Sequence, residues 1–518
     1  MTRRGAYPGR SAALSSGRET TDLEIGREGA AEVSRGHSTC EGKGRTRSAR
    51  QSGMTQRGKR QNTRQLAFAW GEEGETLGDP GKGSTPALAS GRRGALAGGL
   101  MEAIVAADNM RLAMERVRAN KGSPGVDGMS VEEMPAYLRA EWRHLVERLL
   151  SGGYEPEPVR RAMIPKRSGG KRELGIPTVV DRLIQQAILQ VLTPIYDPTF
   201  SPYSYGFRPG KSAHQAIEKA RQYVAEGKEW VVDLDLEKFF DRVNHDMLMG
   251  ELAKRVTDKR LLRLIRWYLE AGILSEGVVH EREEGTPQGG PLSPLLANIL
   301  LDRFDRELER RGHSFCRYAD DCNIYVRSQR AGERVMASVT RYLEKKLKLK
   351  VNRSKSGVDR AARRKFLGLR VIGGEGKARL SIAPESRTRL KQEVRRISKR
   401  NRGVALQAVL AELGRYTDGW VGYFHVAKTP SVFQDFDQWL RRRLRCYQWK
   451  QWKWPRTRAK ALLEAKIGRY LSWGTAYGNH GPWCVAGSPA MCQALSNAAL
   501  ERLGFRSLLK RYQALATS

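Results

Sequence analysis

The chain has 518 residues, which predicts two to four domains, and 40% of them are hydrophobic, enough to build buried cores. Lysine and arginine total 92 against 56 aspartate and glutamate, so the formal net charge of +36 points to a polyanion such as nucleic acid, with ribosome-like basicity or an anionic membrane surface as alternatives. No apolar run approaches the roughly 18 residues of a membrane span, which argues against a membrane-spanning protein. The six cysteines form no C-x-x-C pair, which argues against a disulfide framework and predicts a reducing cytoplasm.

Residues 1–98 are predicted to be a disordered basic leader. They are rich in glycine, hold three aromatic residues (Tyr7, Phe68 and Trp70) and show no sustained helical or strand period. Such a tail could touch RNA or be dispensable. Ordered structure is expected to begin near Met101.

The next hundred residues combine helices with one basic hairpin. Apolar spacing predicts helices at residues 101–118, 131–150 and 181–198. Residues 158–178 predict a hairpin with a Gly-Gly turn, and it carries Arg160, Arg161, Lys166, Arg167, Lys171 and Arg172. Lysine and arginine neutralise phosphate oxygens, so this hairpin suits a triphosphate grip; a solvated basic turn fits it equally well.

A loop rich in glycine and aromatic residues follows, reading YSYGFRPGKSAHQAI at 203–217 and leading into a helix near Ser212. The aromatic residues beside Arg208 and Lys211 could contact a template backbone or its bases. They could equally be core aromatics beneath a loop.

Residues 230–236 predict a strand with Asp233 and Asp235 on one face. Acids in an apolar strand are costly unless they are paired or bound to metal, and spacing alone leaves both residues open as ligands. Phe239 and Phe240 follow, one of which could line a nucleotide pocket while the other packs in the core.

The central stretch of the chain is FCRYADDCNIYV, residues 315–326. It predicts a β-hairpin with Asp320 and Asp321 at the turn. A solvated Asp-Asp turn is common, but with a third carboxylate nearby the pair suits Mg²⁺ ions that stabilise the attacking and leaving oxygens of a phosphoryl displacement.

A helical stretch (246–271) and a Gly/Pro loop running into a helix (284–302) precede this hairpin, and Gln288 in the loop offers an amide to a base or sugar.

After the hairpin the sequence predicts a basic helix (331–349), a loop with Lys355 (352–358) and a short strand (365–371). From Arg387 to Lys460 there are 19 lysines and arginines against five acids, with five interleaved tryptophans. We predict a helical domain with a basic RNA-binding face, whose aromatic residues partly pack and partly stack. A final helix is expected near 490–515.

The order of these pieces resembles the palm and fingers of reverse transcriptases. A basic hairpin, a strand aspartate, a PQGGPLSP loop, a YADD hairpin, a loop lysine and an FLG strand follow one another. Together with the basic helical domain and its GWVGYFH (419–425), they are similar to bacterial group II intron-encoded reverse transcriptase/maturases over about residues 101–518.

The resemblance implies an α+β right-hand fold with fingers and palm at 99–378, a helical thumb or maturase X domain at 379–475, and a helical tail at 476–518 that could be a DNA-binding remnant. It implies synthesis of DNA on an RNA template with a DNA primer and dNTPs, two Mg²⁺ ions (Mn²⁺ as a substitute), and binding of intron RNA and target DNA for splicing and retrohoming. A bacterial cytoplasmic nucleoprotein is expected, with no membrane and no obligate protein partner.

The resemblance also assigns residues. The D-x-x-x-x-F-D pattern falls on 235–241, so the metal ligands are Asp235, Asp320, Asp321 and the backbone carbonyl of Leu236. The nucleotide is assigned to Lys166, Arg172, Phe240 (which excludes a 2′-hydroxyl), Gln288 and Gly289. Template and primer are assigned to Arg208, Lys355, Phe366, Leu367 and Gly368, the last three resembling a primer grip. Intron RNA is assigned to Arg441, Arg442, Arg443, Trp449 and Lys450.

One departure concerns the HNH endonuclease that many family members carry. The tail holds His480, Cys484 and Cys492 without a C-x-x-C pair, so the resemblance implies the short class, whose introns insert after terminator hairpins. Two other interpretations compete: a splicing cofactor that uses the polymerase fold as a platform, and a polymerase adopted for defence or diversity generation. The YADD, strand aspartate and basic finger residues favour an active polymerase.

Overall fold

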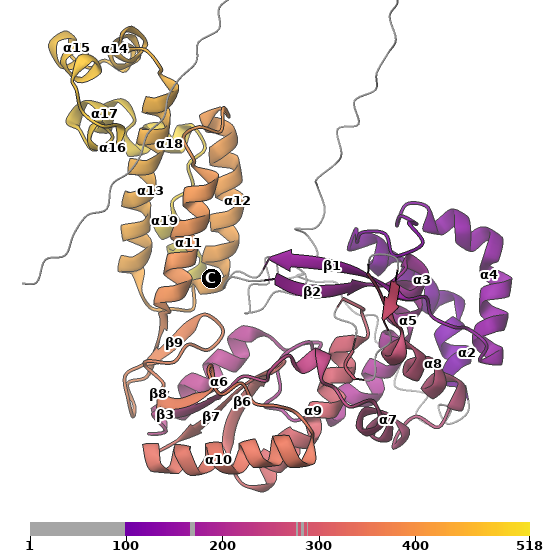
Figure 1. The fold of residues 1–518 in the computed structure, drawn as a ribbon. Helices are drawn as coiled ribbons and strands as arrows, with labels where there is room; N and C mark the ends of the chain where they lie inside the picture. The colour runs from indigo at the N-terminus through magenta and orange to yellow at the C-terminus, as the bar shows by residue number, and fades with distance from the viewer. Residues whose placement is uncertain (1–98, 166–170, 276–277, 281–283, 287–288, 518) are drawn as a thin grey trace, which may run out of the picture. The chain divides into compact units, whose positions relative to one another are not determined.

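The computed structural model describes residues 99–165, 171–275, 278–280, 284–286 and 289–517 (Figure 1). The chain divides into two units, Met1–Lys59 and Arg60–Ser518, and every described residue belongs to the second. The predicted leader and the predicted nucleotide ligands Lys166 and Gln288 therefore lie outside the described residues. No helix in the described part is long and apolar enough to cross a membrane.

The N-terminal part of the second unit packs helices around α5 (Val179–Tyr196), which is buried along most of its length. Around it lie α2 (Leu100–Val105), α3 (Ala107–Ala119), α4 (Met134–Ser151), α7 (His245–Ala253), α8 (Lys259–Glu270) and α9 (Ser293–Arg310). The predicted hairpin is confirmed as β1 (Val159–Pro165) and β2 (Lys171–Ile176), in a sheet of order β2-β1-β4-β5 with β4 (Ile273–Ser275) and β5 (Val278–His280). The single helix predicted at 101–118 is wrong, because extended backbone at Ala106 separates α2 from α3.

The second sheet is antiparallel and has the order β6-β7-β3-β8. Its strands are β3 (Trp230–Leu234), β6 (Ser314–Tyr318), β7 (Asp321–Val326) and β8 (Gly357–Arg360). Val232 and Ile324 face a core shared with α10 (Gln329–Lys346), whereas Val231 and Tyr325 face a core shared with α6 (Ala213–Ala225). The two helices cover opposite faces of the sheet (Figure 1) because successive side chains in a strand alternate between faces.

The C-terminal part begins with the hairpin β9 (Leu369–Ile372) and β10 (Arg379–Ile382). We call the following helices the C-terminal helical region: α11 (Pro384–Ile397), α12 (Leu406–Phe424), α13 (Pro430–Gln451), α14 (Pro455–Glu464), α15 (Arg469–Tyr477), α16 (Pro482–Val485), α17 (Pro489–Ala494), α18 (Asn497–Arg502) and α19 (Leu508–Ala516). The helix predicted at 490–515 is wrong, since α17, α18 and α19 are separate and begin at serine caps whose side chains accept backbone N–H bonds. The predicted domain limits stay predictions.

A buried carboxyl ties the N-terminal helices together. Asp181, 1% exposed at the start of α5, accepts hydrogen bonds from the hydroxyls of Thr178 (2.7 Å), Tyr154 (2.9 Å) and Tyr268 (3.2 Å). Burial raises the pKa of Asp181 to about 6, although these hydrogen bonds oppose the shift.

Replacing Asp181 with Asn should flatten the pH dependence of stability between about pH 4 and 6. The unfolded pKa is about 3.9, so in this window the folded state binds more protons than the unfolded state and stability falls as pH rises. The two-unit difference is worth roughly 3 kcal/mol above pH 6. Thermal unfolding midpoints at pH 4.5, 5.5 and 7 measure the effect, with Asp108→Asn, at an exposed position of α3, as the control. Equal pH slopes in wild type and Asp181→Asn would contradict the assignment.

Candidate functional site

The strand register brings the predicted carboxylates to one end of the second sheet. The β3–β7 ladder ends at the pair of Leu234 with Cys322. Asp235 follows Leu234 and Asp321 precedes Cys322, so continuing the antiparallel register places these two acids opposite each other. Asp320 is the next residue along the chain, in the turn before β7. All three are half-buried.

The hairpin turn differs by one residue from the prediction. Tyr318 pairs with Asp321, so the two turn residues are Ala319 and Asp320, and Asp321 opens β7. Ala319 has φ +57°, because a two-residue hairpin turn that matches the strand twist needs positive φ at its first residue. A residue with a Cβ is strained there, so its surroundings must hold the turn.

Asp235 is held by the loop after α10. Its Oδ2 accepts a hydrogen bond from Asn352 Nδ2 at 2.9 Å and lies 3.6 Å from Lys355 Nζ. The backbone N–H of Asp235 donates to Ser356 Oγ at 2.9 Å, and its carbonyl accepts from the N–H of Asn352 at 2.9 Å. Lys355, assigned to template and primer, thus lies beside a candidate metal ligand. Sequence reasoning missed Asn352 and Ser356, although they flank Lys355 in NRSKS.

The structure separates the two acids that spacing left open. β3 ends at Leu234, so the strand predicted to reach Leu236 is two residues shorter, and Asp235 lies beyond its end. Asp233 lies inside the sheet opposite Asn323 and forms an ion pair with Arg364 at 3.5 Å. Burial raises the pKa of Asp233 to about 6 and Arg364 opposes that shift. Leu236, predicted to offer its carbonyl, forms a β-bridge with Val351.

Backbone contacts hold the described residues that are predicted to bind the nucleotide. Phe239 is buried and Phe240 half-buried, with ring centroids 5.2 Å apart. The carbonyl of Phe240 accepts from Thr286 N at 2.6 Å, which docks the loop before α9 onto the turn after β3. Gly289 has φ +129°, and a Cβ there would lie 2.5 Å from the carbonyl oxygen of Gly175 in β2. Arg172 lies in β2 opposite Ile164.

The residues assigned to the primer grip form a turn rather than the predicted strand, which starts only at Leu369. Leu367 and Gly368 have φ +51° and +77° in succession. The carbonyl of Leu367 accepts from Tyr423 Oη at 2.9 Å, and that of Gly368 accepts from Ser386 Oγ at 2.9 Å. Helices α11 and α12 therefore hold this turn against β9, with Phe366 buried beside it.

The guanidinium of Arg208 is bound within the protein. It pairs with Asp197 at 2.7 Å, donates to the carbonyls of Ser201 and Ser204 at 2.6 and 2.9 Å, and its side chain is 6% exposed. The assignment to template binding lacks support, because these groups occupy the donors that a phosphate would need.

The residues assigned to intron RNA also differ in how far they are buried or bound within the protein. Trp449 is 2% exposed and packs in the core beneath Arg458, so its assignment to intron RNA lacks support. Arg443 donates to Ser398 Oγ at 2.9 Å, and Arg442 donates to the carbonyl of Trp483 at 3.1 Å. Arg441 lies 3.8 Å from Asp437, and its side chain is 16% exposed. Lys450 is exposed.

The carboxylates offer the hard oxygen donors that Mg²⁺ prefers, and the register gathers them at one end of the sheet, so the donor set fits magnesium. Within the described ranges, no group of three or more His, Cys, Asp or Glu side chains is placed so that it could hold a metal ion.

Two protein families match successive parts of the chain. The family described as reverse transcriptase (RNA-dependent DNA polymerase) matches residues 164–371, and the group II intron, maturase-specific domain matches residues 387–464. The chain is 36% identical to Protein YkfC of Escherichia coli (strain K12) over 280 residues, which are 46% of this chain and 74% of that protein. It is 37% identical to the group II intron-encoded protein LtrA of Lactococcus lactis subsp. cremoris over 196 residues, 38% of this chain and 32% of that protein.

The chain belongs to the group II intron-encoded reverse transcriptase/maturase family. The predicted fold class, a reverse transcriptase domain followed by a helical maturase domain, is confirmed. Among solved structures, a chain of the partial Cas6-RT-Cas1--Cas2 complex is 27% identical, with a TM-score of 0.33 and coverage of 48% of this chain and 43% of that chain.

One glycine that sequence reasoning did not assign shapes the candidate site. A Cβ on Gly206 would lie 2.3 Å from the backbone nitrogen of Ala319 and 3.0 Å from the carbonyl carbon of Tyr318. The YSYGFRPG loop therefore packs its backbone directly on the YADD turn. The signal was a glycine between aromatic residues, which marks a close backbone approach.

Replacing Gly206 with Ala should lower nucleotide incorporation on an RNA template at least tenfold. The added methyl group forces backbone against backbone, so the turn that carries Asp320 must shift. Primer extension measures the loss, and circular dichroism reports whether the fold persists. Gly250→Ala in α7, where a Cβ meets nothing within 4 Å, is the matched control. Full incorporation by folded Gly206→Ala would contradict the close packing.

Proposed function

We propose that this chain is an RNA-directed DNA polymerase encoded by a group II intron, and that it binds its intron RNA to promote splicing and retrohoming. The observation that carries the polymerase proposal is the register that places Asp235 opposite Asp321, next to Asp320. Family membership supports both parts of the proposal. Its proposed partners are intron RNA, an RNA template with a DNA primer, dNTPs and target DNA, in the bacterial cytoplasm.

The reaction would be attack of a primer 3′-hydroxyl on the α-phosphate of a dNTP. The hydroxyl loses its proton, the new phosphodiester bond forms, and the bond between the α- and β-phosphates breaks to release pyrophosphate. Two Mg²⁺ ions on Asp235, Asp320, Asp321 and the Leu236 carbonyl would supply charge stabilisation at the attacking and leaving oxygens. The loop of Asn352 and Ser356 orients Asp235 through its side chain and backbone. Arg172 and Lys166 would neutralise the triphosphate, and Phe240 would lie beneath the sugar.

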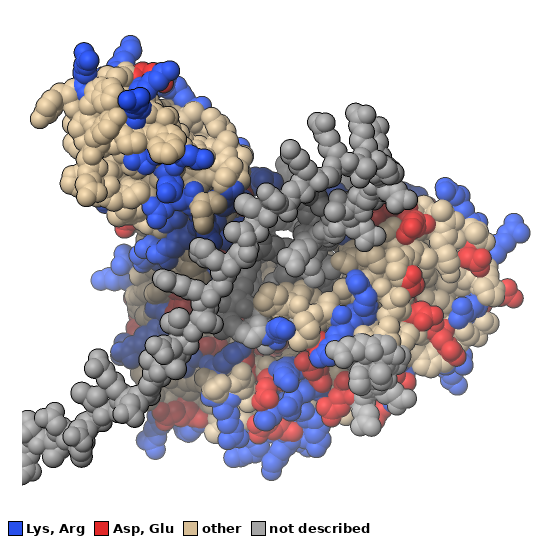
Figure 2. Space-filling view, turned by 45° about the horizontal axis from the view of Figure 1, so that its top comes forward, with Lys and Arg blue, Asp and Glu red and all other residues tan. Residues whose placement is uncertain are grey.

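Charge supports RNA binding by the C-terminal helical region. Figure 2 shows lysine and arginine with few acids over its helices at the upper left, whereas acids are interspersed with basic residues over the lower and right parts of the face drawn. Lysine and arginine contacts to phosphates make binding strong and dependent on salt. Exposed Lys450 and Trp454, 71% exposed, are available to such a partner.

Asp320→Asn and Asp235→Asn should each lower primer extension on an RNA template at least 100-fold. The amide keeps the shape of the side chain but removes the negative charge that would bind metal. Single-nucleotide incorporation with Mg²⁺ measures the loss, and Asp359→Asn, an acid of β8 in the same sheet, is the control. Near-wild-type incorporation by either variant would sink the site assignment.

The same Asp320→Asn protein separates polymerase from maturase. Retained splicing of the intron, with polymerisation lost, is expected if RNA binding resides in the helical region. Loss of both activities in a folded protein would contradict independent roles.

Phe240→Ala should admit ribonucleotides, because removing the ring opens the space that a 2′-hydroxyl would occupy. The ratio of kcat/KM for a dNTP to that for the matching rNTP is expected to fall at least tenfold. Phe239→Leu is the control, since Phe239 is buried in the core and should alter stability rather than sugar choice. An unchanged ratio in Phe240→Ala would remove this role.

A further inference from the structure

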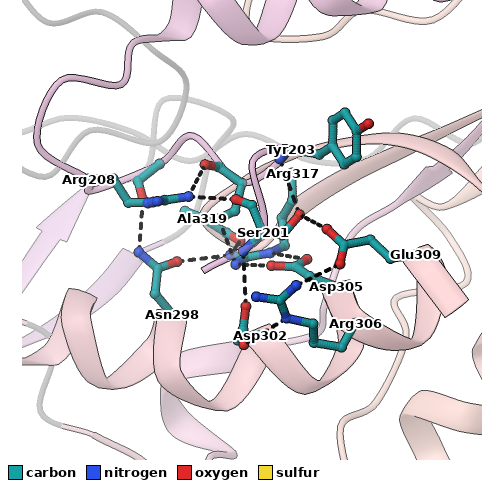
Figure 3. Close-up of polar contacts among 12 residues, drawn as sticks. Ser201, Tyr203, Arg208, Asn298, Asp302, Asp305, Arg306, Glu309, Arg317 and Ala319 are labelled. Carbon is teal, nitrogen blue, oxygen red and sulfur yellow. Dashed lines mark hydrogen bonds and ion pairs between the residues drawn. The ribbon is translucent and has the colours of Figure 1, made fainter. Parts of the chain in front are cut away.

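A buried arginine lies directly behind the YADD turn. Arg317 is the penultimate residue of β6, and its side chain is 1% exposed. Its guanidinium donates to Asp305 Oδ1 (2.7 Å) and Oδ2 (2.6 Å), Asn298 Oδ1 (2.9 Å), Ser204 Oγ (2.7 Å) and the carbonyl oxygen of Ala319 (2.8 Å). These five bonds match the five N–H groups of an arginine (Figure 3).

One of these bonds reaches the catalytic turn itself. The carbonyl of Ala319 belongs to the peptide that joins Ala319 to Asp320. Arg317 therefore clamps the peptide next to the candidate metal ligand, at the residue whose φ of +57° is costly without support. The bond spans two residues, so it fixes the direction in which the chain leaves β6.

The same arginine joins the turn to two other elements. Asp305 and Asn298 project from α9, where both are buried, and Asn298 Nδ2 also donates to the carbonyl of Gly206 at 2.9 Å. The backbone of Arg317 donates to the carbonyl of Tyr203 and accepts from Tyr205, both at 2.9 Å. Helix α9, the 203–206 loop and β6 thus meet at one side chain.

Stability alone does not explain this choice of residues. A buried ion pair loses so much hydration that well-packed apolar residues of similar volume are often at least as stable. An apolar pair could fill the space between β6 and α9, but it could not donate to the Ala319 carbonyl. A lysine could not donate to the Ala319 carbonyl and also bind Asp305, Asn298 and Ser204, since its ammonium group lacks the planar fork of a guanidinium.

We propose that Arg317, oriented by Asp305, is a positioning residue that sets the Ala319–Asp320 turn for metal-dependent nucleotidyl transfer. It does not touch substrate, because it is buried beneath the turn. The inference rests on the proposed polymerase function.

The test compares three variants of the full chain in primer extension on an RNA template. Arg317→Leu/Asp305→Leu removes both charges together, so that neither charge is left buried without its partner. The thermal unfolding midpoint of this double variant is expected to lie within a few degrees of that of the wild type. Arg317→Lys keeps the charge without the fork. Ser204→Ala removes one bond of the five and keeps the test meaningful should the other two variants fail to fold.

The expected signature is a loss in kcat with little change in KM for the dNTP. The double variant and Arg317→Lys should lose at least 30-fold in kcat and Ser204→Ala about threefold, each with KM within threefold of wild type. The Mg²⁺ concentration for half-maximal rate should rise in the order of these losses. Asp437→Asn is the matched control: this carboxylate is 2% exposed, binds Ser507 Oγ and Leu508 N in the helical region, and its loss should lower stability without this signature.

Two outcomes overturn the inference: unchanged kcat and Mg²⁺ dependence in the folded variants, or equal losses in Asp437→Asn. The proposed function fails separately, if the wild-type chain extends no primer or if Asp320→Asn extends it normally. The positioning role alone would be rejected if the wild type extends the primer, Asp320→Asn does not, and the Arg317 variants remain fully active.

Discussion

The pairing of β3 with β7 is the constraint on which the rest of the structure depends. β3 is flanked by β7 and β8, and its side chains alternate between the core of α10 and the core of α6. A slip of one residue would exchange these faces and bury the acids where the valines now pack. Packing on both faces therefore fixes the register, and the register places Asp235 opposite Asp321. The geometry of the site is a consequence of how its sheet is buried.

Close backbone contacts connect the end of this sheet to the surrounding loops. Gly206 lies against Ala319, Gly289 lies against Gly175, and Thr286 bonds to the carbonyl of Phe240. None of these contacts uses a side chain for recognition. They join loops from separate motifs to the sheet end, so that pieces far apart in sequence form one surface around the carboxylates.

The excess of basic residues is divided between two uses. Several buried or half-buried arginines bind partners within the protein: Arg208 pairs with Asp197, Arg317 pairs with Asp305, and Arg443 donates to the hydroxyl and carbonyl of Ser398. Others, with exposed lysines, remain on the surface of the C-terminal helical region. Net charge predicted a polyanionic partner but did not reveal which cations are available to it. Burial made that distinction, because a desolvated arginine must satisfy its donors within the protein.

The sequence by itself determined the family, the order of the motifs and the candidate acids. YADD, PQGGPLSP and the strand aspartates are local patterns, and the hairpin and most helices follow from local periodicity. Tertiary structure decided what local patterns do not contain. It placed Asp235 beyond the end of β3 and kept Asp233 inside the sheet, opposite Asn323. It turned Trp449 and Arg208 inward, because helical spacing and residue type do not say which face a neighbouring element will cover. It also brought Asp305 beneath the YADD turn, since a partner twelve residues away becomes a contact only when α9 packs against β6.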